Sequence, residues 1–396
     1  MAIVPVSHLV LKWARESAGL TVSEAARKLN IQAARGVSPA ERLEALEAGN
    51  ESPSRPLLLR MSRQYRRPLI AFYLETPPIK GDRGEDFRRL PTGFSEIESG
   101  LVDALLRDIR ARQSIIRAVM DDEGETGAIP FVGATAMDAG MDNVSTHIRG
   151  ILDFNLGIFR ARPVVSEAFS YLRAAIEATG VFVLLIGDLG SHHTQLSVEA
   201  FRGFALADPI APFIVVNDQD ARAAWSFTLL HEFTHLCLGQ TGISGGTADT
   251  EIEQFCNDVA GALLLPAGDL LSLEISQRTD FERAVERISI FASARNISRS
   301  MVAYKLYRTQ QIGFDQWNAL RAEFRRQWLE HRAEKRRRSQ EDHGGPDYYV
   351  VRRQRIGPAL LDVVSRMVAS GALSSIDAGR VLGVRPQNIY ELVQPR

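Results

Sequence analysis

Hydrophobic residues recur at helical spacing through the first 75 residues of the chain, with polar residues at the intervening positions. These amphipathic stretches predict four short helices, at residues 8–18, 22–29, 39–48 and 56–72. Thr21 followed three residues later by Glu24 is the pattern of a capping box, and Pro39 after Ser38 suits the first turn of a helix. We therefore expect a compact helical domain over residues 1–75.

The pattern then loses its helical period and regains it. Residues 76–94 begin Thr-Pro-Pro and are rich in glycine and proline, which predicts a linker. Helical spacing returns afterwards and predicts helices at residues 95–120, 137–158 and 167–178. A second domain is therefore expected to start at residue 95.

Three short apolar runs interrupt the helical pattern of this second domain. They are β-branched or aromatic and are bounded by turn residues, so they predict strands at residues 181–186, 201–206 and 213–216. Two strongly apolar helices are predicted next, at residues 223–238 and 250–265. The rest of the chain is predicted to be helical, apart from a basic stretch with helix breakers near residues 332–346.

Together these elements predict an α+β fold that is mostly helical. Its expected parts are a helical bundle over residues 1–75, a domain with a small sheet over 95–275, and a helical extension over 276–396. A chain of 396 residues is long enough for such a division, because one hydrophobic core rarely organises that many residues.

The composition excludes several classes of protein. Hydrophobic residues make up 45%, charged residues 24% and the net charge is −1, so the chain is neither disordered nor uniformly basic. The longest apolar run, residues 181–186, is too short to cross a membrane, and the first residues do not have the pattern expected of a secretory signal. Two cysteines without a CxxC spacing exclude a disulfide framework. We expect a cytoplasmic protein without a membrane partner, and the composition leaves a homodimer open.

The sharpest chemical signal is the HExxH spacing of His231, Glu232 and His235. Residues four apart lie on the same face of a helix, so the two imidazoles can converge on one Zn²⁺ while Glu232 lies beside the metal. On a helical projection the opposite side of the helix is apolar, formed by Trp225, Leu229, Phe233 and Leu236. One face is therefore expected to pack while the other holds the metal.

The HExxH pattern alone also arises by chance, so the prediction of a metal site needs a second segment that carries a ligand. Glu253 comes about twenty residues later on the next predicted helix, and small residues near it allow the two helices to approach closely. In the predicted helix Glu253 shares a face with Asn257 and Gly261, beside a packing stripe of Ile252, Phe255, Val259 and Ala262. Glu253 is therefore well placed as a third metal ligand.

The same segments resemble the ImmA/IrrE family of bacterial metallo-endopeptidases. The resemblance rests on Phe227–Leu236, Glu253–Ala260 and Leu263–Pro266, and the preceding strands look similar in Arg202–Leu206 and Ile214–Asn217. It covers about residues 165–270. It implies a gluzincin-like fold, Glu253 rather than Glu251 as the third zinc ligand, and Glu232 as the catalytic base. It also implies that the substrate is a partner repressor protein, often one encoded nearby.

A zinc site of this kind activates a water molecule, and the roles of some nearby residues stay unassigned. Two imidazoles and one carboxylate leave a position on Zn²⁺ for water, whose proton Glu232 could take. Asn257 is either a residue that orients a ligand or an ordinary surface amide. The residue that stabilises the oxyanion is open, and the candidates by type alone are Tyr348, Tyr349, His192 and His193.

Two further features lie close to the predicted site. Cys237 and Cys256 are expected to be buried free thiols, because two histidines and a glutamate already complete a ligand set; a redox-sensitive zinc site is the lesser alternative. Residues 201–206 are expected to form an edge strand that could pair with an extended peptide substrate, and an ordinary sheet strand is the alternative.

The N-terminal domain resembles the helix-turn-helix domain of XRE-type regulators, on residues 11–18, 22–29 and 52–74. It departs from that type by an apparent insertion at residues 32–38 and by three acids on the expected recognition helix. Glu41, Glu44 and Glu47 would repel phosphates there, against a single Arg42. The candidate DNA contacts are Arg42, Arg55, Arg60 and Arg63. We expect weak DNA binding or a protein partner.

The C-terminal extension has two notable segments. The basic run at residues 332–338 is expected to be a solvated helix end. Residues 376–386 have a helix-turn-helix rhythm and are expected to complete the helical fold.

The function expected from the sequence is zinc-dependent cleavage of a partner repressor by a cytoplasmic bacterial regulator. One alternative is a DNA-binding regulator whose peptidase-like domain binds zinc or a ligand without cleaving. Another is an interaction protein of a toxin–antitoxin or mobile-element module.

Overall fold

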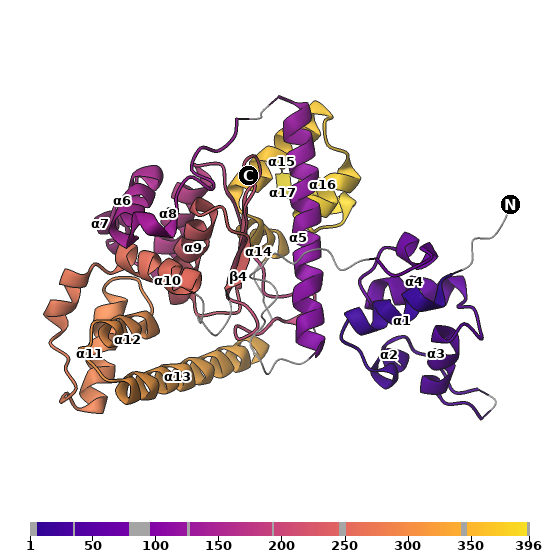
Figure 1. Cartoon of the computed structure of the whole chain (residues 1–396), viewed down its shortest axis with the longest axis horizontal. Coiled ribbons are helices and arrows are strands. Elements are labelled where there is room, and N and C mark those ends of the chain that lie inside the picture. Colours follow the sequence, from indigo (N-terminus) through magenta and orange to yellow (C-terminus); the bar gives the residue numbers. More distant parts are fainter. Residues whose placement is uncertain are drawn as a thin grey trace. The chain divides into compact units, whose positions relative to one another are not determined.

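Helices make up most of the chain in the computed structural model, and one small sheet interrupts them (Figure 1). The structure describes residues 6–34, 36–78, 96–124, 127–191, 194–244, 251–341 and 347–393. Their contacts form two compact units, one of residues up to 109 with 188–200 and a larger one of 110–187 with 201–396. Most of the predicted linker, from residue 79 to 94, lies outside the described residues. No helix of the described part is both long and apolar enough to cross a membrane.

The smaller unit contains the helices predicted near the N-terminus. They are α1 (His8–Ser17), α2 (Val22–Lys28), α3 (Pro39–Glu47), α4 (Arg55–Gln64) and the 3₁₀ helix η1 (Leu69–Tyr73). The capping box predicted at Thr21 and Glu24 is present. The single helix expected over residues 56–72 is divided in two, because Arg66 has a left-handed φ of 50° and Pro68 follows it.

A buried ion pair crosses the core of this unit. Arg15 of α1 donates from Nε to Glu47 Oε1 at 2.8 Å and from Nη2 to Glu47 Oε2 at 2.9 Å, and both side chains are buried. The expectation that Glu47 repels DNA phosphates from a surface is therefore wrong, because its charge is neutralised inside the unit. Glu41 caps its own helix at Ser38, which leaves Glu44 as the exposed acid of α3 without such a role.

The larger unit contains a four-stranded sheet. Its strands are β1 (Phe182–Leu185), β2 (Gly203–Leu206), β3 (Phe213–Val216) and β4 (Gly242–Ser244), in the order β1-β3-β2-β4. β1 and β3 are parallel, whereas β2 runs antiparallel to both β3 and β4. The three predicted strands are confirmed, and β4 is an addition. The prediction that residues 201–206 form an edge strand is wrong, because β3 and β4 flank β2.

Helices cover one face of this sheet and build the main core. They are α6 (Met141–Leu152), α7 (Leu156–Arg160), α8 (Val165–Glu177), α9 (Arg222–Cys237) and α10 (Glu251–Leu264), with the short η3 (Met137–Ala139) before them. The helix expected over residues 137–158 is broken, because Asp153 has a left-handed φ of 45°. Val183, Ile214 and Val216 of the sheet share one hydrophobic core with α8, α9 and α10. The long α5 (Glu96–Asp122) anchors to the sheet region, where Gln113 Nε2 donates to the carbonyls of Leu206 and Ala211.

The remaining helices follow α10 in the chain. They are η5 (Ala267–Leu273), α11 (Phe281–Ser293), α12 (Arg299–Arg308), α13 (Phe314–Glu341), α14 (Tyr348–Ile356), α15 (Pro358–Ser370), α16 (Ser375–Leu382), η6 (Pro386–Asn388) and α17 (Ile389–Val393). Buried Arg173 of α8 fastens the C-terminal helices to β1, since it pairs with Glu177 and donates to the carbonyls of Val183 and Gln354. The described residues thus form the mostly helical α+β fold that the sequence predicts.

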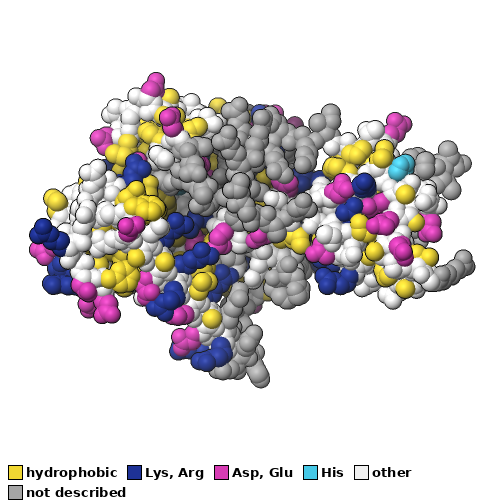
Figure 2. All heavy atoms as spheres, turned by 60° about the horizontal axis from the view of Figure 1, so that its bottom comes forward, with side chains coloured by type: hydrophobic (Ala, Val, Ile, Leu, Met, Phe, Trp, Pro, Cys, Tyr) yellow, Lys and Arg dark blue, Asp and Glu magenta, His cyan; other side chains and the backbone are white. Residues whose placement is uncertain are grey.

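The basic run near the end of α13 is part of a continuous helix. α13 extends to Glu341, so the basic residues 332–338 lie within it, and the helix breakers expected after them, at residues 344–346, lie outside the described residues. Arg326 pairs with Glu323 and Glu330, and Arg338 pairs with Glu334. Figure 2 shows positive and negative side chains interspersed on the visible face of the larger unit. These observations favour the solvated helix end that the sequence predicts, and the structure adds its ion pairs.

Candidate metal centre

The connection between β3 and α9 fixes the start of the helix that carries the HExxH residues. Asn217 is fully buried; its Nδ2 donates to the carbonyl of Phe201 at 3.0 Å, and its Oδ1 accepts from the Gln219 amide at 3.0 Å. Trp225 of α9 donates from Nε1 to the carbonyl of Asp220 at 3.2 Å. These bonds satisfy the polar groups at the turn, so α9 leaves the sheet in a defined direction.

The other end of α9 is closed by the backbone of a distant segment. The amide of Gly133 donates to the carbonyl of Leu236 at 3.0 Å, and that of Thr135 donates to the carbonyl of Cys237 at 3.1 Å. Gly133 and Gly239 both have a positive φ, and a Cβ on Gly239 would lie only 3.0 Å from the Cα of Gly133. The last carbonyls of α9 are therefore satisfied by a contact that two glycines permit.

α9 is buried on all sides around the candidate ligands. His231 is 3% exposed, and Glu232 and His235 are both 0% exposed. The face that the sequence predicts to hold the metal is not exposed to solvent: α10 covers part of this ligand face, and β2 packs on the same helix. Because little water reaches these buried side chains, electrostatic interactions between them are stronger than at the protein surface.

α10 presents Glu253 toward α9 from its first turn. The buried side chains of α10 are Glu253, Cys256, Val259, Ala260, Gly261, Leu263 and Leu264. The predicted packing stripe is confirmed at Val259 and at Phe255, which is half-buried and packs against the main core. Ile252 and Ala262 are also only half-buried. The buried face of α10 includes the acid Glu253. A search for a purely hydrophobic stripe therefore does not find this face.

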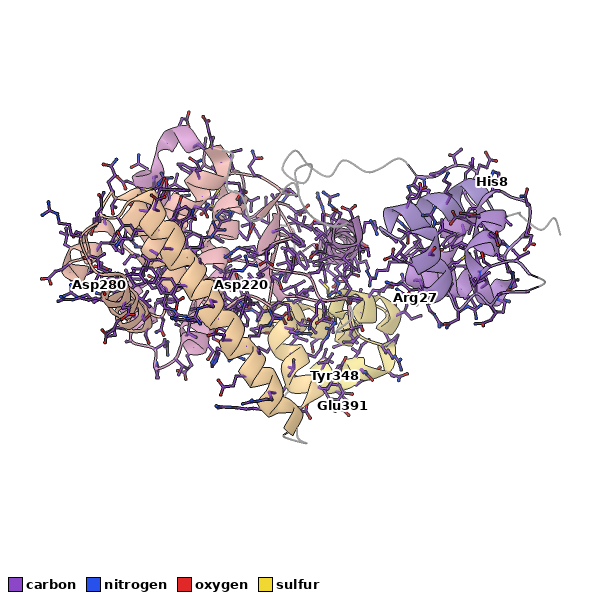
Figure 3. All side chains as sticks on the ribbon, turned by 90° about the horizontal axis from the view of Figure 1, so that it is seen from below. His8, Arg27, Asp220, Asp280, Tyr348 and Glu391 are labelled. Carbon is purple, nitrogen blue, oxygen red and sulfur yellow. The ribbon has the colours of Figure 1, made fainter. Side chains whose placement is uncertain are left out.

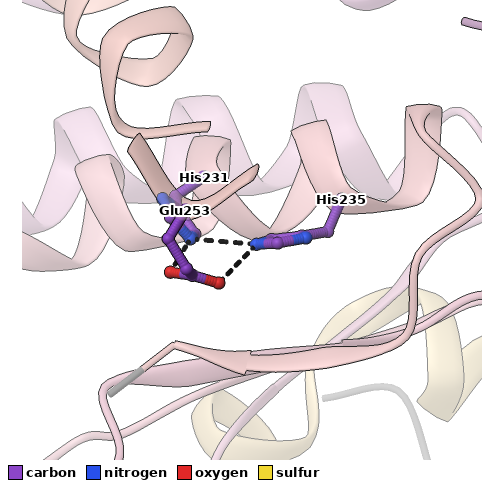
Figure 4. A group of neighbouring side chains, drawn as sticks. All are labelled: His231, His235 and Glu253. Carbon is purple, nitrogen blue, oxygen red and sulfur yellow. Dashed lines mark hydrogen bonds and ion pairs between the residues drawn. The ribbon is translucent and has the colours of Figure 1, made fainter. Parts of the chain in front are cut away.

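Three side chains meet at one point between α9 and α10 (Figure 4). His231 Nε2 lies 3.1 Å from His235 Nε2. The two carboxylate oxygens of Glu253 lie 3.2 Å from His231 Nε2 and 3.1 Å from His235 Nε2. Ligands of a tetrahedral ion with metal–ligand bonds near 2.1 Å are about 3.4 Å apart, so these atoms have nearly the spacing of a ligand set.

The charges of the group also suit a cation. Burial alone would raise the pKa of Glu253, but hydrogen bonds to His231 and His235 outweigh it and hold that pKa well below its usual range. The carboxylate is therefore ionised, and it faces two imidazole Nε2 atoms that converge on the same point. Two nitrogen donors and one carboxylate suit a transition metal better than Ca²⁺ or Mg²⁺, which prefer oxygen ligands.

Glu232 lies against the sheet at a position that only glycine leaves open. A Cβ built on Gly203 of β2 would lie 2.8 Å from Glu232 Oε1 and 2.7 Å from Thr228 Cγ2. The absent side chain therefore makes room for the Glu232 carboxylate. Gly203 was not among the predicted site residues, although a glycine inside a strand is a signal of close backbone or helix approach.

We expect Gly203→Ala to destabilise the chain by about 1–3 kcal/mol, as overpacking does, and to lower any activity that depends on Glu232. Chemical denaturation and the rate of substrate cleavage check the two effects. Gly268→Ala is the matched control, because a Cβ there meets no atom within 4 Å and the backbone is unstrained. Equal effects of the two substitutions would show that Gly203 does not make room for Glu232.

The other residues predicted for the peptidase site are outside the ligand group. Asn257 is half-buried one turn after Glu253, and Glu251 is exposed at the start of α10. Tyr348 is 55% exposed at the start of α14, and its ring packs edge-on against Tyr349 with centroids 5.2 Å apart. His192 and His193 lie outside the described residues. The role of stabilising an oxyanion therefore stays open.

The arginines predicted to contact DNA lie on two helices of the smaller unit. Arg55, Arg60 and Arg63 are exposed on α4. Arg42 of α3 donates from Nη1 to the carbonyl of Gln32 at 2.7 Å, so it also braces the connection before its own helix. A phosphate contact by Arg42 would compete with this bond.

Both cysteines are buried and form no disulfide, and neither belongs to the group of metal-ligand candidates. Burial raises the pKa of Cys237 to about 12. At pH 8 only about one Cys237 thiol in ten thousand is then ionised, and the thiolate is the reactive form.

We therefore expect both thiols to resist alkylation by iodoacetamide in the native chain and to react once it is unfolded in guanidinium. Intact mass before and after labelling measures this. Rapid labelling of one thiol in the native chain would instead support a redox-sensitive site.

Comparisons with known proteins agree with this geometry over part of the chain. No curated protein matched the chain, and no solved structure matched it. Residues 188–307 match the model of the M78 peptidase family described as the IrrE N-terminal-like domain. The matched segment contains α9, α10 and all three candidate ligands, and it supports the assignment of this part of the chain to a metallopeptidase of the ImmA/IrrE family.

Proposed function

We propose that the chain is a zinc-dependent endopeptidase that hydrolyses a peptide bond in a specific partner protein, a DNA-binding repressor encoded nearby. The observation that carries this proposal is the convergence of His231, His235 and Glu253 beside the buried Glu232. The family match over residues 188–307 supports the peptidase chemistry. The repressor substrate rests on the family resemblance alone.

Zn²⁺ is the ion that fits the three donors best. Two imidazole nitrogens and one carboxylate form one of the usual ligand sets of catalytic zinc, and the spacing of their atoms is close to that of a tetrahedral ion. Zn²⁺ held by these three residues would act as a Lewis acid and would lower the pKa of the attacking water to about 7. The ionised Glu253 balances part of the charge of the cation.

Glu232 is the proposed general base. It precedes Phe233 and Thr234 on the same helix as both histidines, so its carboxylate is held beside the ligand group by backbone geometry. The space left by Gly203 lets the carboxylate lie between α9 and β2. From there Glu232 accepts a proton from the attacking water and passes it to the departing amine nitrogen of the peptide.

The burial of the group favours a selective substrate over general protein degradation. Each of these four residues, taken whole, is at least nine-tenths buried in the part of the chain that the structure describes. A folded protein surface cannot reach such atoms, so a substrate has to present an extended segment. We propose that a flexible segment of the partner repressor supplies it.

The smaller unit is proposed to regulate this activity rather than to bind DNA tightly. Its α2 and α3 are joined by residues 29–38, far more than the three or four residues of a compact helix-turn-helix. The exposed Arg55, Arg60 and Arg63 offer phosphate contacts without sequence information. A degenerate XRE-type module that binds DNA weakly or holds a protein partner fits these features.

The proposal is tested by incubating the zinc-loaded chain with the repressor encoded by the neighbouring gene. We expect cleavage at one bond, and no cleavage of an unrelated DNA-binding protein of similar size. Bound zinc without cleavage of any neighbouring gene product would favour the alternative, a regulator whose zinc-binding domain does not cleave.

A further inference from the structure

Phe227 is a partly exposed residue in a helix that is otherwise buried around the metal-ligand candidates. Every other residue of α9 from Trp225 to Cys237 is buried, and the structure describes all of them. Phe227 is half-buried, and its side chain packs in part against the main hydrophobic core. Within this stretch of α9, the helix is therefore open to its surroundings at Phe227.

Phe227 lies on the same side of α9 as the two histidines. Residues four apart in a helix lie one above the other, so Phe227, His231 and His235 form one row. The ring centroids of Phe227 and His231 are 6.4 Å apart. Asp220, labelled in Figure 3, comes just before the end of α9 at which this row begins. Phe227 is thus the neighbour of the ligand group on the side toward the start of the helix.

Exposure falls along this row from the start of α9 to its end. Ala223 and Phe227 are half-buried, His231 is 3% exposed and His235 is 0% exposed. Glu253, which lies 3.2 Å from His231 Nε2, is 8% exposed. The ligand group is therefore most open beside His231 and Glu253, and Phe227 borders this opening from α9.

The side chains at this opening favour an apolar substrate residue. The Phe227 ring offers apolar surface next to the ligand group, and Ala223, one turn earlier, occupies little space. A leucine or phenylalanine of the substrate that packs on the ring removes apolar area of both partners from water. A charged side chain at the same place would lose contacts with water and gain no polar partner from Phe227 or Ala223.

We propose that Phe227 contacts the substrate and selects a large apolar side chain next to the cleaved bond. This inference rests on the proposed function and deepens it, because it names the class of segment that the metal centre accepts: an extended stretch with leucine, methionine or phenylalanine beside the bond. Phe227 has no group that binds a metal or moves a proton. It determines which segment reaches the metal, and it leaves the chemistry to the other residues.

The test measures binding separately from cleavage. Overlapping labelled peptides that cover the neighbouring repressor are added to the zinc-loaded Glu232→Gln chain, and fluorescence anisotropy gives their affinities. Each large apolar residue of the best-binding peptide is then replaced by alanine. We expect one replacement to weaken binding about tenfold or more, and to weaken it less than about threefold when the chain also carries Phe227→Ala. Such non-additivity is the signature of two side chains in contact.

Phe255→Ala is the matched control for Phe227→Ala. Phe255 is also half-buried and packs against the same core, but it follows Glu253 by two residues and so lies on the far side of α10 from the ligands. The peptide replacement should keep its full effect in Phe255→Ala. Phe227→Leu retains an apolar side chain and should keep most of the effect. Thermal melting and zinc content show whether each variant is folded and loaded.

Cleavage by chains that retain Glu232 should follow the same pattern. Phe227→Ala should lower kcat/KM about tenfold for the native repressor, and much less for the repressor with the alanine replacement. The inference is overturned if Phe227→Ala affects both substrates equally, or if Phe255→Ala reproduces its effect. A preference in binding that depends on Phe227, without cleavage by the wild-type chain, would overturn the proposed function and support this contact. Absence of binding and of cleavage would overturn both.

Discussion

Glu232→Gln is expected to abolish cleavage while the chain keeps its metal. The substitution replaces a proton acceptor by an amide of nearly the same shape, and it removes none of the three ligands His231, His235 and Glu253. General base catalysis typically contributes a factor of about 10²–10⁴, so the residual rate should fall by at least that much. Elemental analysis should therefore show an unchanged metal content in Glu232→Gln, while the rate of cleavage falls.

The surroundings of Glu232 accommodate glutamine without a change of packing. The side chain is fully buried against Gly203 and Thr228, and an amide fits the same volume. Glu251→Gln is the matched control, because this acid is exposed on α10 and outside the ligand group. If Glu232→Gln loses metal as fully as a ligand variant does, Glu232 is a ligand or a structural residue and the proposed role is wrong.

Glu253→Ala is expected to remove tight metal binding. The substitution takes away the only charged donor of the group and leaves two imidazole Nε2 atoms 3.1 Å apart. Loss of a supporting residue outside the ligand set costs about 10–100-fold in metal affinity, so loss of a ligand should cost more. Titration of the stripped chain with Zn²⁺ in a competing chelator measures the change.

Glu251→Ala supplies the comparison for this second substitution. Glu251 and Glu253 are two residues apart on the first turn of α10, but Glu251 is exposed and Glu253 faces the histidines. Thermal melting should show that zinc stabilises the wild-type chain and the Glu251→Ala chain, and that Glu253→Ala has lost this stabilisation. An unchanged zinc affinity in Glu253→Ala, with a loss in Glu251→Ala, would show that Glu251 rather than Glu253 is the third ligand.

Local geometry sets the parts of the site that could be predicted from the sequence. His231 and His235 are four residues apart, and any helix places such residues on one face, so their convergence follows from spacing alone. The strands at residues 182–185 and 213–216 are short, apolar and bounded by turns, and these signals are local as well. Glu253 required one further assumption, that α10 packs beside α9.

The parts that it missed depend on contacts between distant segments. β4 is three residues long, and a hydrophobic pattern does not show that it lies beside β2, so the sequence predicts β2 as an edge strand. Gly203 matters only because Glu232 of another element lies against it. The sequence predicts Glu47 as a surface acid. Only the fold brings Arg15, 32 residues away, into contact with Glu47 inside the core.

The central claim is that this chain hydrolyses a peptide bond in a partner protein by means of a metal held between α9 and α10. The most direct measurement is the intact mass of the neighbouring repressor after incubation with the chain in its zinc-loaded, chelator-stripped and zinc-reloaded forms. The account predicts two products whose masses sum to that of the repressor plus one water, in the loaded and reloaded samples only. Products of equal yield in the stripped sample, or an intact repressor in all three, would contradict it.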